Sequence, residues 1–88
     1  MRGKNAEKIV FKLLGEFERI RKENGLSHEK LAKLAGVNRS TISLLESKKR
    51  IPTILTCLKI AEALEVSLSD LLKTVCDIER LLQNPIKK

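Results

Sequence analysis

Residues 27–50 bring together hydroxyl, cationic and apolar side chains whose chemistry suits contact with a nucleic acid. Arg39 could donate paired hydrogen bonds to O6 and N7 of guanine, which discriminates between bases by about 1 to 3 kcal/mol. A phosphate contact is the alternative for Arg39. Ser40 and Ser43 can bond to several bases, and Leu44 could press on a thymine methyl group. We therefore predict that these four residues contact bases.

A second set of polar side chains in the same stretch suits phosphate oxygens. Hydroxyls, a side-chain amide and cations near helix N-termini position a protein on nucleic acid without reading its sequence. The predicted phosphate contacts are Ser27, His28, Asn38, Thr41, Lys48, Lys49 and Arg50. The whole chain carries 18 Lys and Arg against 11 Asp and Glu, a net charge of +7, which favours a polyanionic partner.

The elements that must position these residues are helical. Apolar residues recur at steps of three and four, and no alternating β-branched run predicts a strand, so the expected fold class is all-α. Ser27 and Asn38 as N-caps, with Gly25 and Gly36 as helix stops, predict helices over 28–35 and 39–47 with a sharp turn between them. Further helices are expected over 6–24, 54–64 and 68–83, the second of them burying Ile54, Leu55, Leu58, Ala61 and Leu64.

The segment 25–53 closely resembles the lambda-repressor-like, Cro/C1-type helix-turn-helix family, and the likeness covers about residues 20–72. The residues that match the family pattern are Gly25, Leu26, Ser27, Leu31, Ala32, Gly36, Val37, Ile42, Ser43, Glu46, Arg50, Pro52 and Thr53. The resemblance implies a compact five-helix DNA-binding domain, with extended N- and C-terminal helices, that spans 1–88 as a single domain. It also implies a sequence-specific transcriptional regulator of double-stranded DNA, similar in size to restriction-modification controller proteins.

Two positions depart from the family pattern, and one pair follows it. The family usually has Gln at His28; a neutral histidine donates from one ring nitrogen only, so we expect pH-sensitive DNA binding. The usual Gly is Lys48 here, where positive φ penalises a side chain by about 1 kcal/mol, so we expect a differently shaped loop. Arg21 and Glu46 lie where the family usually has a structural ion pair between the first helix and the recognition helix.

The last predicted helix extends its apolar stripe beyond what the motif's own core can cover. Val75, Ile78, Leu81 and Leu82 are therefore predicted to form a homodimer interface, since a twofold contact also helps a small domain to bury area. Two recognition helices would then contact a near-palindromic operator. The N-terminal extension could pack on this helix within the subunit or across the dimer.

An antitoxin is the alternative function. In that case the apolar tail from Ile78 to Ile86 would bind and silence a partner protein, and the chain would bind DNA as well. A dimer that buries this stripe in the isolated protein would favour the regulator.

Other classes of function are not expected. The chain has one histidine, no Gly-rich phosphate loop and no nucleophile motif, so we predict no enzyme and no cofactor. Cys57 and Cys76 lack metal-ligand spacing, which predicts no metal site, and both are expected as small hydrophobic residues in a reducing cytosol. No signal core or membrane span is present. We expect a cytoplasmic protein without a small-molecule ligand.

Overall fold

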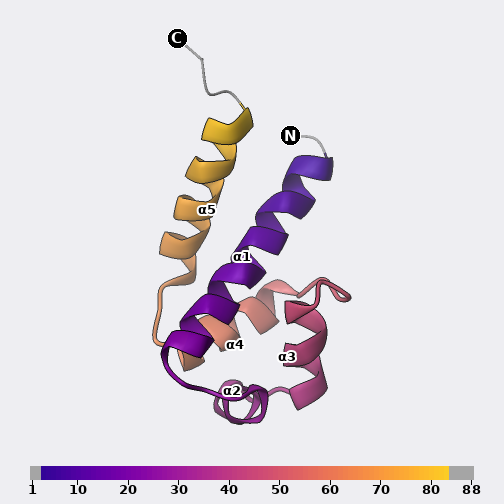
Figure 1. The fold of residues 1–88 in the computed structure, drawn as a ribbon, viewed down its shortest axis with the longest axis vertical. Helices are drawn as coiled ribbons and strands as arrows, with labels where there is room; N and C mark the ends of the chain where they lie inside the picture. The colour runs from indigo at the N-terminus through magenta and orange to yellow at the C-terminus, as the bar shows by residue number, and fades with distance from the viewer. Residues whose placement is uncertain (1–2, 84–88) are drawn as a thin grey trace.

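The computed structural model describes residues 3–83, with side chains for 5–82, and this part of the chain contains five helices and no strand (Figure 1). The helices are α1 (Gly3–Glu23), α2 (His28–Ala35), α3 (Arg39–Glu46), α4 (Ile54–Ala63) and α5 (Leu68–Gln83). The predicted all-α fold class is confirmed. The predicted boundaries agree with these to within three residues.

Four of the five helices end with the same backbone motif. A residue with left-handed φ follows each of α1 to α4, and the next N–H bonds to the carbonyl five residues back, as in a Schellman motif. Gly25 and Gly36 provide the left-handed residue after α1 and α2, where φ is 68° and 72°. Lys48 and Glu65 provide it after α3 and α4, where φ is 63° and 59°. The ends of α3 and α4 therefore place a residue with a side chain in a backbone conformation that glycine adopts more easily.

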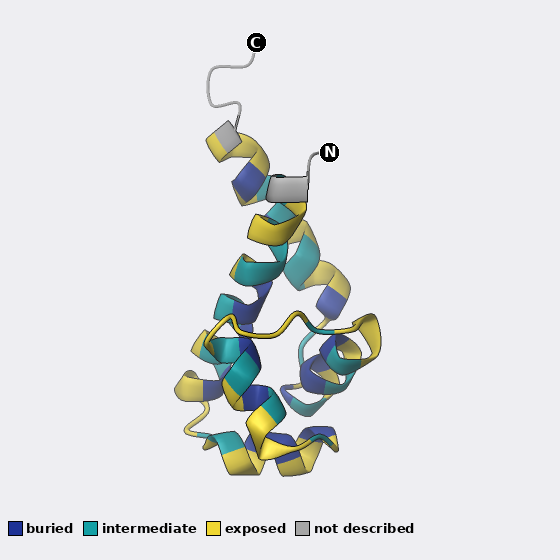
Figure 2. Ribbon diagram, turned by 90° about the vertical axis from the view of Figure 1, so that its right-hand side faces the viewer, coloured by how far each residue is buried: buried dark blue, intermediate teal, exposed yellow. Residues whose placement is uncertain are grey.

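The core lies where the helices face one another, and Figure 2 shows the buried segments on their inner sides. α1, α2 and α4 contribute most of it, and α3 adds only two side chains. The buried cluster consists of Leu13, Leu14, Phe17, Leu31, Ala32, Ala35, Ile42, Leu45, Cys57, Ile60, Ala61, Leu64 and Leu68. Burial of these apolar side chains holds the short α2 and α3 in place, since helices of eight residues are not stable alone.

α4 is apolar on two faces, and the sequence prediction combined residues of both. Cys57 and Ile60 are buried together with the predicted Ala61 and Leu64. The predicted core residues Ile54, Leu55 and Leu58 are instead 50–66% exposed and form one surface with Ile51, which we call the α4 surface. Both faces satisfy helical spacing, so periodicity could not distinguish them.

α1 and α5 lie side by side and antiparallel, and they project beyond the other helices (Figure 1). We call α1 together with α5 the arm. Val10 and Phe11 pack against the core, so the N-terminal extension lies against α5 within one chain. Val75 is only 2% exposed, so it offers a second chain little surface, and its predicted place in a dimer interface stays a prediction.

Candidate nucleic-acid interface

A helix, a turn and a second helix position the predicted DNA contacts. α2 begins after Ser27, whose Oγ accepts a hydrogen bond from the Lys30 N–H at 3.0 Å, so the predicted N-cap is confirmed. The hydroxyl proton of Ser27 stays available for a phosphate oxygen. After α2 the left-handed Gly36 reverses the chain, and α3 starts after Asn38.

α3 turns one face to the core and the other to solvent. Ile42 and Leu45 are buried, and α3 packs against α2 and α1. Of the predicted base contacts, Arg39, Ser40 and Ser43 are exposed and Leu44 is half-buried. Within residues 3–83 the guanidinium of Arg39 has no hydrogen bond or ion pair, so its five N–H donors are available to a ligand.

The N-terminus of α3 has neither a side-chain cap nor an acidic residue to offset the helix dipole. Asn38 occupies the N-cap position with an extended backbone, but its side chain makes no capping hydrogen bond, contrary to the sequence prediction. The first turn of α3 also contains no acidic residue, whereas α2 has both a Ser27 cap and Glu29 in its first turn. The free amides and the positive end of the helix dipole at α3 therefore favour an anion.

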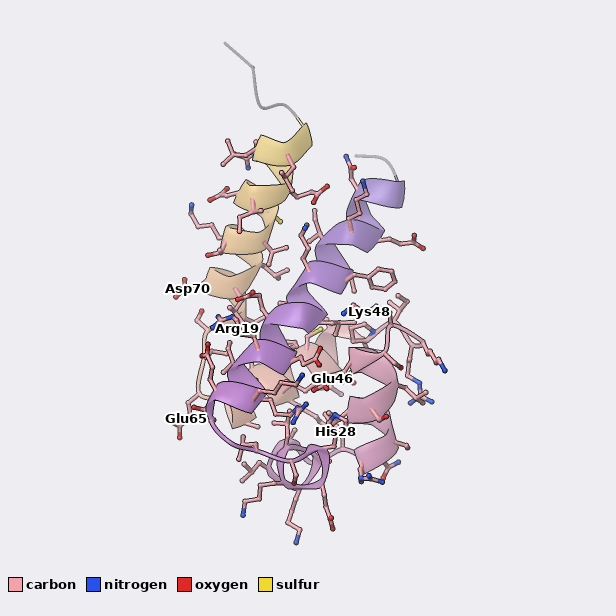
Figure 3. All side chains as sticks on the ribbon, viewed as in Figure 1. Arg19, His28, Glu46, Lys48, Glu65 and Asp70 are labelled. Atoms are coloured by element: carbon pink, nitrogen blue, oxygen red, sulfur yellow. The ribbon has the colours of Figure 1, made fainter. Side chains whose placement is uncertain are left out.

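The loop after α3 keeps the glycine-type turn without a glycine. Lys48 adopts φ 63°, its N–H bonds to Leu45 O at 3.1 Å, and the Lys49 N–H bonds to Leu44 O at 2.9 Å. The expectation of a differently shaped loop is thus wrong, because these two hydrogen bonds hold the left-handed turn despite its cost of about 1 kcal/mol. Figure 3 labels Lys48 at the C-terminal end of α3.

This loop also replaces an apolar contact with charge. After α1, α2 and α4, the residue that follows the left-handed position is apolar and packs against the core: Leu26, Val37 and Val66. After α3 it is the exposed Lys49. Within the described residues no ion pair engages the loop cations Lys48, Lys49 and Arg50, although Arg50 Nη1 lies 3.5 Å from Thr41 Oγ1 as a weak hydrogen-bond donor.

The predicted ion pair between α1 and α3 is present. Arg21 Nε and Nη2 donate to the two carboxylate oxygens of Glu46 at 2.6 and 3.0 Å, and Arg21 Nη1 donates to Leu26 O at 2.7 Å. Both side chains are about nine-tenths buried, at 10% and 11% exposed. A two-pronged, nearly buried pair of this kind fixes the orientation of α3 relative to α1.

His28 joins this pair instead of pointing freely at solvent (Figure 3). Its Nε2 lies 2.8 Å from Glu46 Oε1. A neutral ring that donates this proton keeps only an acceptor at Nδ1 and offers a phosphate no second donor, and the predicted phosphate contact of His28 stays a prediction. The sequence could not indicate this contact, since the two residues are 18 positions apart and their spacing carries no local signal.

The environment of Glu46 favours its charged form. Burial raises the pKa of this carboxyl, but the hydrogen bonds from Arg21 and His28 outweigh burial and lower the pKa below its ordinary value. The same bond to Glu46 raises the pKa of Arg21. The pair is therefore ionised at neutral pH.

The described part of the chain offers little for other kinds of site. No group of three His, Cys, Asp or Glu side chains there could hold a metal ion. Burial raises the pKa of the Cys57 thiol, which agrees with the predicted role as a small hydrophobic residue. None of the helices in residues 3–83 has the length and apolar character needed to cross a membrane.

Comparison with known proteins agrees with this geometry. A family model described as helix-turn-helix matches residues 17–71, and the chain belongs to this family, of the Cro/C1 type. The chain is 40% identical over 57 residues to the uncharacterized HTH-type transcriptional regulator y4dJ of Sinorhizobium fredii. This matched span covers 64% of this chain and 74% of the relative. It is 35% identical over 51 residues to the uncharacterized HTH-type transcriptional regulator YgzD of Bacillus subtilis, covering 58% and 77%. No solved structure matches significantly.

Family membership confirms the predicted class: a DNA-binding protein of the helix-turn-helix type that is not an enzyme. The matched span includes the whole of α2, α3 and α4. The assignments of individual residues to bases and phosphates stay predictions.

Proposed function

We propose that this chain is a cytoplasmic transcriptional regulator that binds a near-palindromic operator as a homodimer. α3 enters the major groove, where Arg39, Ser40, Ser43 and Leu44 contact bases. Phosphates on either side are held by Ser27, Asn38, Thr41 and the three loop cations. The relatives named as transcriptional regulators support this role.

One observation carries the proposal. The exposed face of α3 lies between an uncompensated helix N-terminus and three successive cations, and in the described chain neither Arg39 nor Lys49 has an ion-pair partner. A folded protein gains little from leaving such groups unpaired, whereas a phosphate backbone on both sides of the major groove would engage them.

Dimerisation is proposed through α5. Ile78, Leu81 and Leu82 are 47%, 66% and 63% exposed, and large apolar side chains grouped in this way mark an interaction surface. The proposal requires that the α5 dimer present its two copies of α3 to half-sites about 34 Å apart, one turn of the duplex.

Selection of duplexes from a random pool, with wild type, Arg39→Ala and Lys49→Ala, tests the DNA contacts. Arg39→Ala should relax the preference at one base position and weaken the preferred site by about 1 to 3 kcal/mol. Lys49→Ala should weaken all duplexes alike. Uniform weakening by Arg39→Ala would remove its base contact, and failure of the wild type to bind any duplex would end the proposal.

The antitoxin alternative has less support. Both relatives carry regulator names, and part of the proposed toxin-binding tail, residues 84–86, lies outside the described residues. No observation on the described residues favours a toxin over a second copy as the partner of α5.

A further inference from the structure

We propose that the groove between α1 and α5 beside Gly15 receives Leu81 of a second copy of this chain. The inference rests on the homodimer proposed above and specifies which surfaces meet. It assigns a role to a glycine that neither the sequence motif nor the fold of one chain explains.

Gly15 lies in the middle of the 21-residue helix α1. A glycine inside a helix is less stable than alanine, and it is usually retained for a turn or a close contact. Neither reason applies within this chain, because Gly15 has no left-handed φ and a Cβ built on it meets no atom within 4 Å. The space beside Gly15 is open, so a glycine here allows something from outside the chain to approach α1.

A groove occupies that space. α1 contributes Lys12, Gly15, Glu16 and Arg19 to its lining, and α5 contributes Thr74, Val75 and Ile78. Its floor is apolar at Val75, and the half-exposed Ile78 lies at its edge. The charged side chains on the α1 side have partners within the chain, since Arg19 Nη2 donates to Glu16 Oε1 at 2.8 Å and Lys12 Nζ lies 3.9 Å from Glu79 Oε1. The groove therefore suits an apolar side chain.

The same arm supplies such a side chain. In an antiparallel pair of α5 helices with a twofold axis at Ile78, a residue three positions after Ile78 faces one three positions before it. The partner's Leu81 then faces Val75, the floor of the groove, and the contact occurs twice by symmetry. Leu81 is 66% exposed in one chain, so this contact would cover apolar surface that the monomer leaves in water.

Charge favours α5 over the α4 surface as the place where two copies meet. α5 contains Lys73 and Arg80 against Asp70, Asp77 and Glu79, two cations against three acids, a net charge of −1 in a chain of +7. The α4 surface instead begins at Ile51, directly after Lys48, Lys49 and Arg50. A twofold contact through the α4 surface would bring together the three loop cations of each chain, and these six charges would repel one another. A contact through α5 would not bring these cations together.

Sedimentation equilibrium of single and double variants tests the groove. Gly15→Leu should keep the monomer folded, since leucine is a good helix former and the position of its Cβ is open, but it should weaken the dimer about ten- to hundredfold by filling the groove. Leu81→Ala should also weaken the dimer. The double variant Gly15→Leu/Leu81→Ala should bind itself more tightly than Gly15→Leu, because the leucine added at position 15 replaces the one removed. Leu58→Ala, on the equally exposed α4 surface, should leave the dimer unchanged.

The outcomes separate this inference from the proposed function. If Gly15→Leu dimerises as wild type does while Ile78→Ala weakens the dimer, the groove is overturned and the α5 dimer stands. If only Leu58→Ala weakens the dimer, the groove contact and the α5 dimer are both overturned. A wild type that is monomeric at about 100 μM, alone and on a two-half-site duplex, also overturns the groove contact and the α5 dimer. Binding of a single half-site by each variant reports on DNA recognition alone.

Discussion

The basic end of the molecule, formed by α2, α3 and the loop 47–53, uses its charges differently from the arm. In α5 and along α1 most charged side chains have partners within the chain: Arg19 with Glu16 and Glu23, Lys22 with Glu18, and Lys73 and Arg80 with Asp77. At the basic end, Arg39, Lys48 and Lys49 have no ion-pair partner in residues 3–83. Exposed ion pairs add little stability, so the two regions do not differ much in how their charges stabilise the fold. They differ in how many charged side chains are available to bind a ligand.

Exposed large apolar residues occur both on the arm and at the basic end. Ile78, Leu81 and Leu82 lie on the arm, and Leu34 and Ile51 lie at the basic end, whereas the outward face of α3 is polar apart from the half-buried Leu44. An ionic ligand therefore suits the outward face of α3, and an apolar partner suits α5. Because these two surfaces lie on different helices, the proposed dimerisation and DNA binding can be tested one at a time.

The largest expected effect is that of salt on the basic end. A dimer that places six loop cations on phosphates should lose about 10³-fold in operator affinity between about 50 and 200 mM salt. Self-association through α5 should change little over the same range, because it buries apolar surface. Fluorescence anisotropy on labelled operator, beside sedimentation without DNA, measures both, and a dimer that is equally salt-sensitive would contradict the division of roles.

Breaking the pair that holds α3 comes next. Arg21→Met leaves the nearly buried Glu46 without its main partner, so the free energy of unfolding should fall by about 2 to 3 kcal/mol, between the values for exposed and buried pairs. Arg19→Met, which removes exposed ion pairs of the arm, should change it little. Urea denaturation measures both, and equal effects would show that the Arg21 pair has no special role.

Acid should act on the same pair with a smaller effect. Because the pKa of Glu46 is lowered in the folded protein, its contribution is fully present above the ordinary value of about 4.5 and is lost as the pH falls through the lower folded value. Wild type should therefore lose more stability than Glu46→Gln between about pH 5 and pH 3. Parallel losses in urea titrations of the two proteins would contradict this assignment.

The smallest expected effects come from the two left-handed residues. Lys48→Gly and Glu65→Gly should each stabilise the fold by up to about 1 kcal/mol, since glycine accepts positive φ without strain. Only Lys48→Gly should also weaken DNA binding, because only Lys48 belongs to the loop cations. Thermal unfolding and anisotropy on the two variants check this, and unchanged DNA affinity in Lys48→Gly would remove Lys48 from the interface.

Most of the helical framework could be predicted because its signals are local. Ser27, Thr53 and Ser67 accept hydrogen bonds from the amides three residues on, as caps do. The family pattern located α2, α3 and the Arg21–Glu46 pair. The exposed face of α3, which we propose contacts bases, followed from the two inward positions, Ile42 and Leu45, by helical geometry alone.

Several features that the sequence did not indicate depend on contacts between distant residues. Helical spacing could not show which stripe of α4 meets the core, or that Val75 is buried within one chain. The partner of His28 is on another helix. The Asn38 side chain was expected to cap α3 because asparagine often does so, yet the backbone reaches the cap conformation without that bond.

The amino-acid sequence by itself determined the five helices, their ends, the basic loop and the family, because capping, periodicity and charge act between near neighbours. Only the tertiary structure decided which apolar faces stay exposed, which cations stay unpaired and that Lys48 holds a left-handed turn. Those outcomes depend on the relative placement of α1, α4 and α5, which is set by burial summed over the whole core.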